Sequence, residues 1–140
     1  MKKIFLYVIA ISAIVTMESC SLEDDDANFE FQYLEITDAE VPESFDFNEV
    51  YQIKVHYLRP NDCTFFEGFD VYKEEETTRQ VVVIGSVLTD QSDCTEVAQE
   101  VEATFDFQVI YKNDYLFKFY TGTDAEGNAE FMEIEVPVNQ

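Results

Sequence analysis

The chain has 140 residues, of which 30 are Asp or Glu and only 8 are Lys or Arg, so its net charge is −22 at pH 7. Nucleic-acid binding depends on cations that neutralise phosphates, and this charge therefore excludes DNA and RNA as partners. The composition is nevertheless that of a folded protein, because 46% of the residues are hydrophobic and 15% are aromatic. A chain of this length, once a targeting segment is removed, forms one core.

Residues 1–19 have the organisation of a bacterial signal peptide. Two lysines follow Met1, and the apolar run over residues 4–15 is shorter than the roughly 20 residues that a membrane-spanning helix needs. The segment Met17-Glu18-Ser19-Cys20 then resembles the lipobox of bacterial lipoproteins. The resemblance implies cleavage before Cys20 and acylation of Cys20, which attaches the protein to a membrane through several acyl chains. The alternative is an ordinary signal peptide followed by an incidental cysteine.

Residues 20–28 form a short acidic tether behind this cysteine. Its sequence Ser21-Leu22-Glu23-Asp24-Asp25-Asp26 resembles the export signal of surface lipoproteins in Bacteroidota-type bacteria. That resemblance implies an outer-membrane anchor with the domain on the cell surface. The alternative is a solvated acidic linker, with the domain on the periplasmic face of the membrane.

From Phe29 onward the apolar residues recur with period two, which indicates strands that bury one face. In the first strand the apolar positions change parity after Tyr33, which we interpret as a β-bulge. The other expected strands cover residues 50–58, 65–73, 79–89, 99–110, 115–120 and 130–138. This pattern predicts an all-β fold, a single seven-stranded β-sandwich over residues 29–140.

The last hairpin makes the fold class more specific. Tyr115 opens a strand, a turn with Gly127-Asn128 follows, and the chain ends in an alternating strand. This arrangement resembles the final hairpin of bacterial immunoglobulin-like domains. In that family a tyrosine at the position of Tyr115 folds its hydroxyl back onto the backbone, which is called a tyrosine corner. The resemblance implies an immunoglobulin-like sandwich and says little about function.

Cys63 and Cys94 remain as a pair once Cys20 is assigned to lipidation, and an exported protein meets an oxidising environment. If residues 65–73 and 79–89 form a hairpin, the two cysteines lie near each other at its open end. We therefore expect a structural disulfide, worth about 3–4 kcal/mol in the chain-entropy model. It differs from the bridge of antibody domains, which joins the second and sixth strands. The sequence has no CxxC motif, so the spacing of the cysteines does not predict a redox role.

The residue pattern does not predict catalysis. His56 is the only histidine, it points away from the core by parity, and no serine or cysteine lies in a nucleophile motif to pair with it. The four glycines form neither a dinucleotide nor a P-loop motif. We therefore expect no catalytic residue, no cofactor and no metal site.

Two acidic loop clusters raise calcium as an alternative, because hard cations prefer oxygen ligands. The clusters are Asp124, Glu126 and Asn128 in the last hairpin and Asp90, Ser92 and Asp93 beside Cys94. Turn chemistry and solvation explain both clusters without an ion, and this is the interpretation we adopt.

Some aromatic residues have parities that place them outside the core, namely Phe66, Tyr72, Tyr120 and Phe131. We interpret them as buried by a shift of strand parity and not as a binding face. The predicted function is that of a lipid-anchored cell-envelope protein, a non-catalytic surface binding or structural module whose candidate partners are an envelope protein and a glycan. The alternative is a glycan- or calcium-binding accessory lipoprotein of a nutrient-uptake system.

Overall fold

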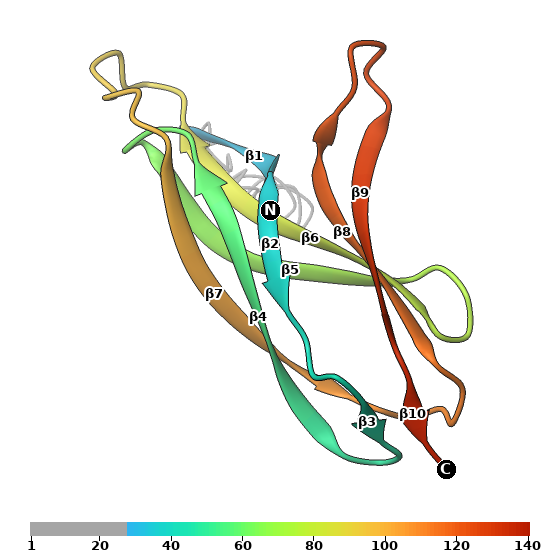
Figure 1. The fold of residues 1–140 in the computed structure, drawn as a ribbon. Coiled ribbons are helices and arrows are strands. Elements are labelled where there is room, and N and C mark those ends of the chain that lie inside the picture. The colour runs from blue at the N-terminus through green and yellow to red at the C-terminus, as the bar shows by residue number, and fades with distance from the viewer. Residues whose placement is uncertain (1–27) are drawn as a thin grey trace, which may run out of the picture.

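The computed structural model describes residues 28–140, which form ten β-strands and no helix (Figure 1). The predicted signal peptide, Cys20 and nearly all of the predicted tether lie outside the described residues. Over residues 28–140 there is no helix long and apolar enough to cross a membrane. The strands are β1 Phe29–Leu34, β2 Ile36–Glu40, β3 Phe45–Asp46, β4 Val50–Arg59, β5 Thr64–Lys73, β6 Thr78–Leu88, β7 Gln99–Gln108, β8 Tyr115–Thr123, β9 Ala129–Val136 and β10 Val138–Asn139.

The strands form two main sheets. In the large sheet the central strand β6 has β5 on one side and both β1 and β8 on the other, with β9 beyond β8 at the edge. β1 pairs with the C-terminal half of β6, and β8 pairs with its N-terminal end. The small sheet has the order β2-β4-β7. β3 and β10 form a short parallel pair at one end of the molecule (Figure 1).

The two sheets share one hydrophobic core. The predicted alternation of β4 is confirmed, because Ile53, Val55 and Tyr57 are buried while the residues between them reach solvent. These side chains belong to the same buried cluster as Phe117 and Phe119 of β8, which lies in the other sheet. The all-β class is therefore confirmed, with two sheets packed on a common core as in a sandwich.

The β-bulge predicted after Tyr33 is a change of sheet instead. β1 pairs with β6 as far as Leu34, and β2 begins at Ile36 and pairs with β4. Leu34 and Ile36 are each 2% exposed, so both reach the shared core although they belong to different sheets. The parity inverts because the chain passes from one layer to the other at Glu35. The register shift that does occur lies between Ile36 and Asp38.

The predicted count of seven strands differs from the ten observed for local reasons. The first predicted strand divides at Glu35, and the last divides at Pro137, which lacks the N–H that a continuous ladder needs. β3 leaves no periodic pattern in the sequence, because it has only two residues and pairs with β10 at the other end of the chain. The five other expected strands are present, with ends that differ by a few residues.

The order of the large sheet differs from that of an immunoglobulin domain. There the third, sixth and seventh strands form one sheet. Here the fourth long strand, β6, lies beside β8 and runs parallel to it, and β5 takes the edge position. This arrangement gives β6 neighbours on both sides over most of its length, and Val81, Val82 and Val83 are all fully buried.

Candidate functional site

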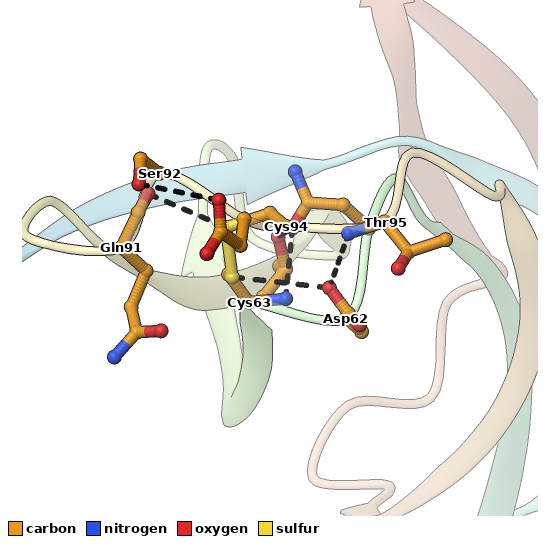
Figure 2. Close-up of a disulfide and its surroundings, with 9 residues drawn as sticks. Asp62, Cys63, Gln91, Ser92, Cys94 and Thr95 are labelled. Carbon is orange, nitrogen blue, oxygen red and sulfur yellow. Dashed lines mark hydrogen bonds between the residues drawn. A yellow bond between two sulfur atoms is a disulfide. The ribbon is translucent and has the colours of Figure 1, made fainter.

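Cys63 and Cys94 form the predicted disulfide, with Cα atoms 5.6 Å apart (Figure 2). Cys63 lies directly before β5, and Cys94 lies in the connection between β6 and β7. The hairpin register places them there, because Thr64 pairs with Val87 and the N–H of Leu88 donates to the carbonyl of Cys63. The bond therefore fastens the connection between the two sheets to the start of β5.

Hydrogen bonds reinforce this junction. The carboxylate of Asp62 accepts a hydrogen bond of 2.7 Å from the backbone N–H of Thr95 (Figure 2). In the part of the chain that the structure describes, the one group of three or more metal-ligating side chains with donor atoms within 4.8 Å of one another is Asp62 with Cys63 and Cys94. Because the two sulfur atoms are bonded to each other, neither is a thiolate ligand. We assign this cluster a structural role.

His56 points outward from the small sheet, as parity predicts, and lies in a network of charges. Its Nε2 is 3.1 Å from a Glu40 carboxylate oxygen, and its Nδ1 is 4.0 Å from Glu100. Lys54, on the same face, is 3.5 Å from Glu40 and 3.7 Å from Glu102. The hydrogen bond from His56, followed by the charge of Lys54, lowers the pKa of Glu40 below its ordinary value. His56 is thus engaged by carboxylates, in an arrangement typical of a solvated surface.

The loop between β8 and β9 uses its acidic residue to build a turn. The Asp124 carboxylate accepts hydrogen bonds from the backbone N–H of Glu126 at 3.0 Å, from that of Asn128 at 2.8 Å and from the Asn128 side chain at 2.9 Å. Gly127 supplies a positive φ of 87° at the tip. These bonds, with the Asn128 side chain first, lower the pKa of Asp124. Turn formation accounts for the cluster, as the sequence interpretation requires. In the other cluster the hydroxyl of Ser92 lies 3.4 Å from Asp93.

Tyr115 forms the hydrogen bonds expected of a tyrosine corner. Its hydroxyl oxygen accepts hydrogen bonds from the backbone N–H groups of Ile110 at 3.1 Å and Tyr111 at 3.0 Å, and the ring is fully buried. The guanidinium of Arg79 lies 5.4 Å from the centre of the ring. These contacts fix the connection between β7 and β8. Because Tyr115 is fully buried, its hydroxyl is not available to a substrate.

The outer face of the large sheet carries a set of aromatic side chains that we call the aromatic face. Strand register shows why they share one side: Leu34 and Val83 pair and point into the core, so the next pair, Tyr33 and Ile84, points outward. Phe31 and Phe65 both pair with Ser86 and lie on the same side. The aromatic face consists of Phe29, Phe31 and Tyr33 of β1, Phe65 and Tyr72 of β5, Tyr120 of β8 and Phe131 of β9.

The rings of this face are exposed and contact one another. Phe31 is 66% exposed, Tyr33 52% and Phe65 47%. The ring of Tyr120 lies 5.9 Å from Tyr33 and 6.1 Å from Phe131, both in edge-to-face geometry, so one row crosses three strands. A shallow cavity of about 290 Å³ lies beside Phe31 and Tyr33.

Polar groups on the aromatic face are bonded to one another. Interaction with the hydroxyl of Tyr33, and then with Asp70, raises the pKa of Tyr72 well above the ordinary value of 10. Lys118 lies 5.1 Å from the centre of the Phe131 ring and 2.9 Å from a carboxylate oxygen of Glu74. The rings are thus held in place by neighbouring side chains.

The interpretation of the outward aromatics as core residues is wrong. Tyr72 is exposed on the aromatic face, and Tyr120 and Phe131 are half-buried there. Phe66 points inward but remains exposed at the rim, stacked on Tyr57 with ring centres 5.6 Å apart. The sequence contained a signal for this face, because alternation places Phe29, Phe31 and Tyr33 opposite to the buried Leu34. The parity change at this point marks the passage from one sheet to the other and not a bulge.

In comparisons with known proteins, no family model, no curated protein and no solved structure matches the chain.

Proposed function

We propose that this chain is a lipid-anchored protein of the bacterial cell envelope whose β-sandwich binds a partner through the aromatic face, without catalysing a reaction. The observation that carries the proposal is the exposure of the aromatic face. Folded monomers rarely expose contiguous apolar patches larger than a few hundred Å², and larger patches typically mark interaction sites. The core does not require these side chains, since the opposite side of each strand supplies it.

The face is large enough for the apolar area that it buries to offset the cost of association. An aromatic side chain buries about 150–250 Å² when it is fully covered. Covering the exposed parts of Phe29, Phe31, Tyr33, Phe65 and Tyr72 therefore removes roughly 400–500 Å² of apolar surface from water, a gross gain of about 10 kcal/mol. That gain is comparable to the cost of association, which is about 4–15 kcal/mol.

We propose a protein without catalytic activity because its reactive side chains are engaged in other contacts. His56 contacts carboxylates, and Cys63 and Cys94 are joined to each other. General-base and nucleophile pairs require a hydroxyl or thiol beside the base, and the contacts of His56 are of another kind.

Photo-crosslinking in producing cells tests the binding face. A photoreactive phenylalanine analogue replaces Phe31 on the aromatic face or, as the matched control, Ile110, which is 51% exposed after β7. We expect one discrete adduct from position 31 and none at position 110. Equal adducts at both positions, or none at either, would contradict the proposal.

The proposed address is the outer membrane, with the lipid on Cys20 and the domain on the cell surface; the alternative is the periplasmic face. Metabolic labelling with a radioactive fatty acid should label the chain and should not label the Cys20→Ala variant. Proteinase added to intact cells should then digest the domain. If the domain survives until the outer membrane is opened, the surface assignment is wrong.

We also propose that the domain is a divergent immunoglobulin-like sandwich. The hydrogen bonds of Tyr115 and the β2-β4-β7 sheet, which corresponds to the first, second and fifth strands of that class, support this assignment. The parallel contact of β6 with β8 is the point of divergence. Backbone nuclear Overhauser effects between Gln80 and Lys118 test it, because an immunoglobulin order has β5 next to β8 and gives no such signal.

A further inference from the structure

We infer that the partner of the aromatic face is a basic protein surface, one with an apolar centre flanked by Lys and Arg side chains. The inference rests on the proposed function and adds the chemistry of the partner. Three properties of the face support this inference. Several of its polar groups already pair with one another, carboxylates line its rim, and its aromatic rings can bind cations.

Several polar groups that lie among the rings already have partners. Ser86 donates a hydrogen bond to Glu67, Lys118 pairs with Glu74, and Tyr72 interacts with Tyr33 and Asp70. A hydroxyl-rich ligand such as a glycan requires free donors and acceptors beside the rings, since polar groups that lose water without a new partner cost free energy. Phenylalanines and the neighbouring Ile84 dominate the exposed part of the face, and they favour an apolar contact patch instead.

Carboxylates surround this apolar centre at both edges of the large sheet. They are Glu67, Asp70 and Glu74 along β5 and its following turn, and Glu133 and Glu135 on β9. Within residues 28–140, the strand register places one cation on this face, Lys118, and Glu74 pairs with it. Protein interfaces typically have an apolar core and a polar rim whose charges complement those of the partner. The rim therefore selects for Lys and Arg.

The same charge disfavours other occupants. A second copy of this chain carries the same charge of −22, and an anionic lipid surface also repels it. A cation, by contrast, gains from the exposed rings as well as from the rim. Lys118 already lies 5.1 Å from the centre of the Phe131 ring, which is the geometry that a partner's Lys or Arg can repeat over Tyr33 or Phe31.

Selection from a random peptide library tests the charge of the partner. The full-length chain, purified in detergent, is presented to twelve-residue peptides displayed on phage, after counter-selection on the triple variant Phe31→Ser, Tyr33→Ser, Phe65→Ser. These three side chains are exposed, so the core stays intact, and an oxidised Cys63–Cys94 bond reports folding. The single variant Phe31→Ser serves if the triple variant does not fold. The exposed pair Val50→Ser and Ile110→Ser is the control for loss of apolar surface elsewhere.

We expect the enriched peptides to combine apolar residues with a net positive charge, and to lose about tenfold or more in affinity on the triple variant. The control pair should leave their affinity unchanged. Enriched peptides of neutral or negative charge overturn the inference and leave the proposed function standing. A glycan array is probed with the same proteins. Glycan hits that depend on Phe31 and Tyr33 would also overturn the inference and leave the proposed function standing. Absence of any ligand that distinguishes the triple variant overturns both.

Reversal of rim charges separates local from general electrostatics. Glu133→Lys with Glu135→Lys changes the rim, and Glu49→Lys with Asp106→Lys makes the same change of net charge away from the large sheet. We expect the rim pair to slow association with a selected peptide about tenfold and to flatten its dependence on salt, and the remote pair to do so much less. Equal effects of the two pairs would show that the net charge alone acts, and the inference would be wrong.

Discussion

The outer faces of the two sheets follow the same alternation and display opposite chemistry. On the small sheet, outward positions carry Glu40, Lys54, His56, Glu100 and Glu102, joined in ion pairs. On the large sheet, outward positions carry the rings of the aromatic face. The small sheet thus shows what this chain places on a surface that only needs to be solvated. The large sheet departs from that pattern, and the departure is the main support for the proposal that its outer face binds a partner.

The sharpest test of this contrast compares a core ring with an outer ring. Phe117 is fully buried between the sheets, and Phe117→Ala should lower the free energy of unfolding by about 3–5 kcal/mol, through lost burial and the cavity that remains. Phe31→Ala on the aromatic face should cost less than about 1 kcal/mol. Urea denaturation of both variants measures the difference. A similar loss at the two positions would mean that the aromatic face is part of the core, and the contrast would disappear.

The disulfide should have the next largest effect, because it fixes the connection that leads from β6 of the large sheet to β7 of the small sheet. Replacing Cys63 and Cys94 together by Ala should cost about 3 kcal/mol in the chain-entropy model. The wild-type chain in a strong reductant is the matched control and should show the same midpoint in urea. If the variant keeps the stability of the oxidised chain, the junction is held by Asp62 and its neighbours without the bond.

Local patterns predicted those parts of the fold that depend on neighbours in sequence. The alternation of β4, the approach of Cys63 to Cys94 across a hairpin and the hydroxyl contacts of Tyr115 all follow from residues close together in the chain. The pairing of β3 with β10 and of β6 with β8 joins distant segments, for which periodicity carries no information.

The aromatic face escaped prediction for a related reason. Period two separates the two sides of a strand without saying which side another sheet covers. Phe29, Phe31 and Tyr33 therefore read equally well as core or as surface until the pairing of β1 with β6 was known. The change of sheet at Glu35 decides the matter, because it sends Leu34 and Ile36 into the core from opposite layers.

Loss of the Tyr115 hydroxyl should have an intermediate effect. Tyr115→Phe keeps the buried ring and leaves the N–H groups of Ile110 and Tyr111 without their acceptor, which costs roughly 1–3 kcal/mol. Tyr111→Phe is the control, since it removes only an exposed contact with Lys73. Tyr115→Phe should therefore have a clearly lower melting temperature than Tyr111→Phe. Equal melting temperatures would show that the hydrogen bonds of the Tyr115 hydroxyl do not stabilise the fold.

Ionisation of Tyr72 should have a smaller effect on stability, and this effect is specific to the aromatic face. The raised pKa of Tyr72 means that its interactions with Tyr33 and Asp70 stabilise the fold fully below pH 10 and that this contribution is lost as the pH rises beyond that value. Burial also raises the pKa of Tyr57, so spectrophotometric titration of Tyr72→Phe should show one late-ionising tyrosine fewer than titration of the wild-type chain. The Tyr33→Phe variant should shift that late titration to lower pH, and an unchanged titration would mean that the two hydroxyls do not interact.

The corresponding test on the small sheet should give the smallest effect and the opposite dependence on pH. The pKa of Glu40 is lowered by His56 and then by Lys54, so the contribution of this carboxylate is complete above its ordinary pKa of 4.5 and is lost as the pH falls through the lower value of the folded state. Below pH 4.5 the Glu40→Gln variant should lose less stability than the wild type. Glu49→Gln, away from the network, should follow the wild type.

Because the network is exposed, salt should reduce the difference in stability between Glu40→Gln and the wild type. If Glu40→Gln follows the wild type through the acid range, the ion pairs of the small sheet do not bear on stability, and solvation alone explains the acidic residues that this face carries.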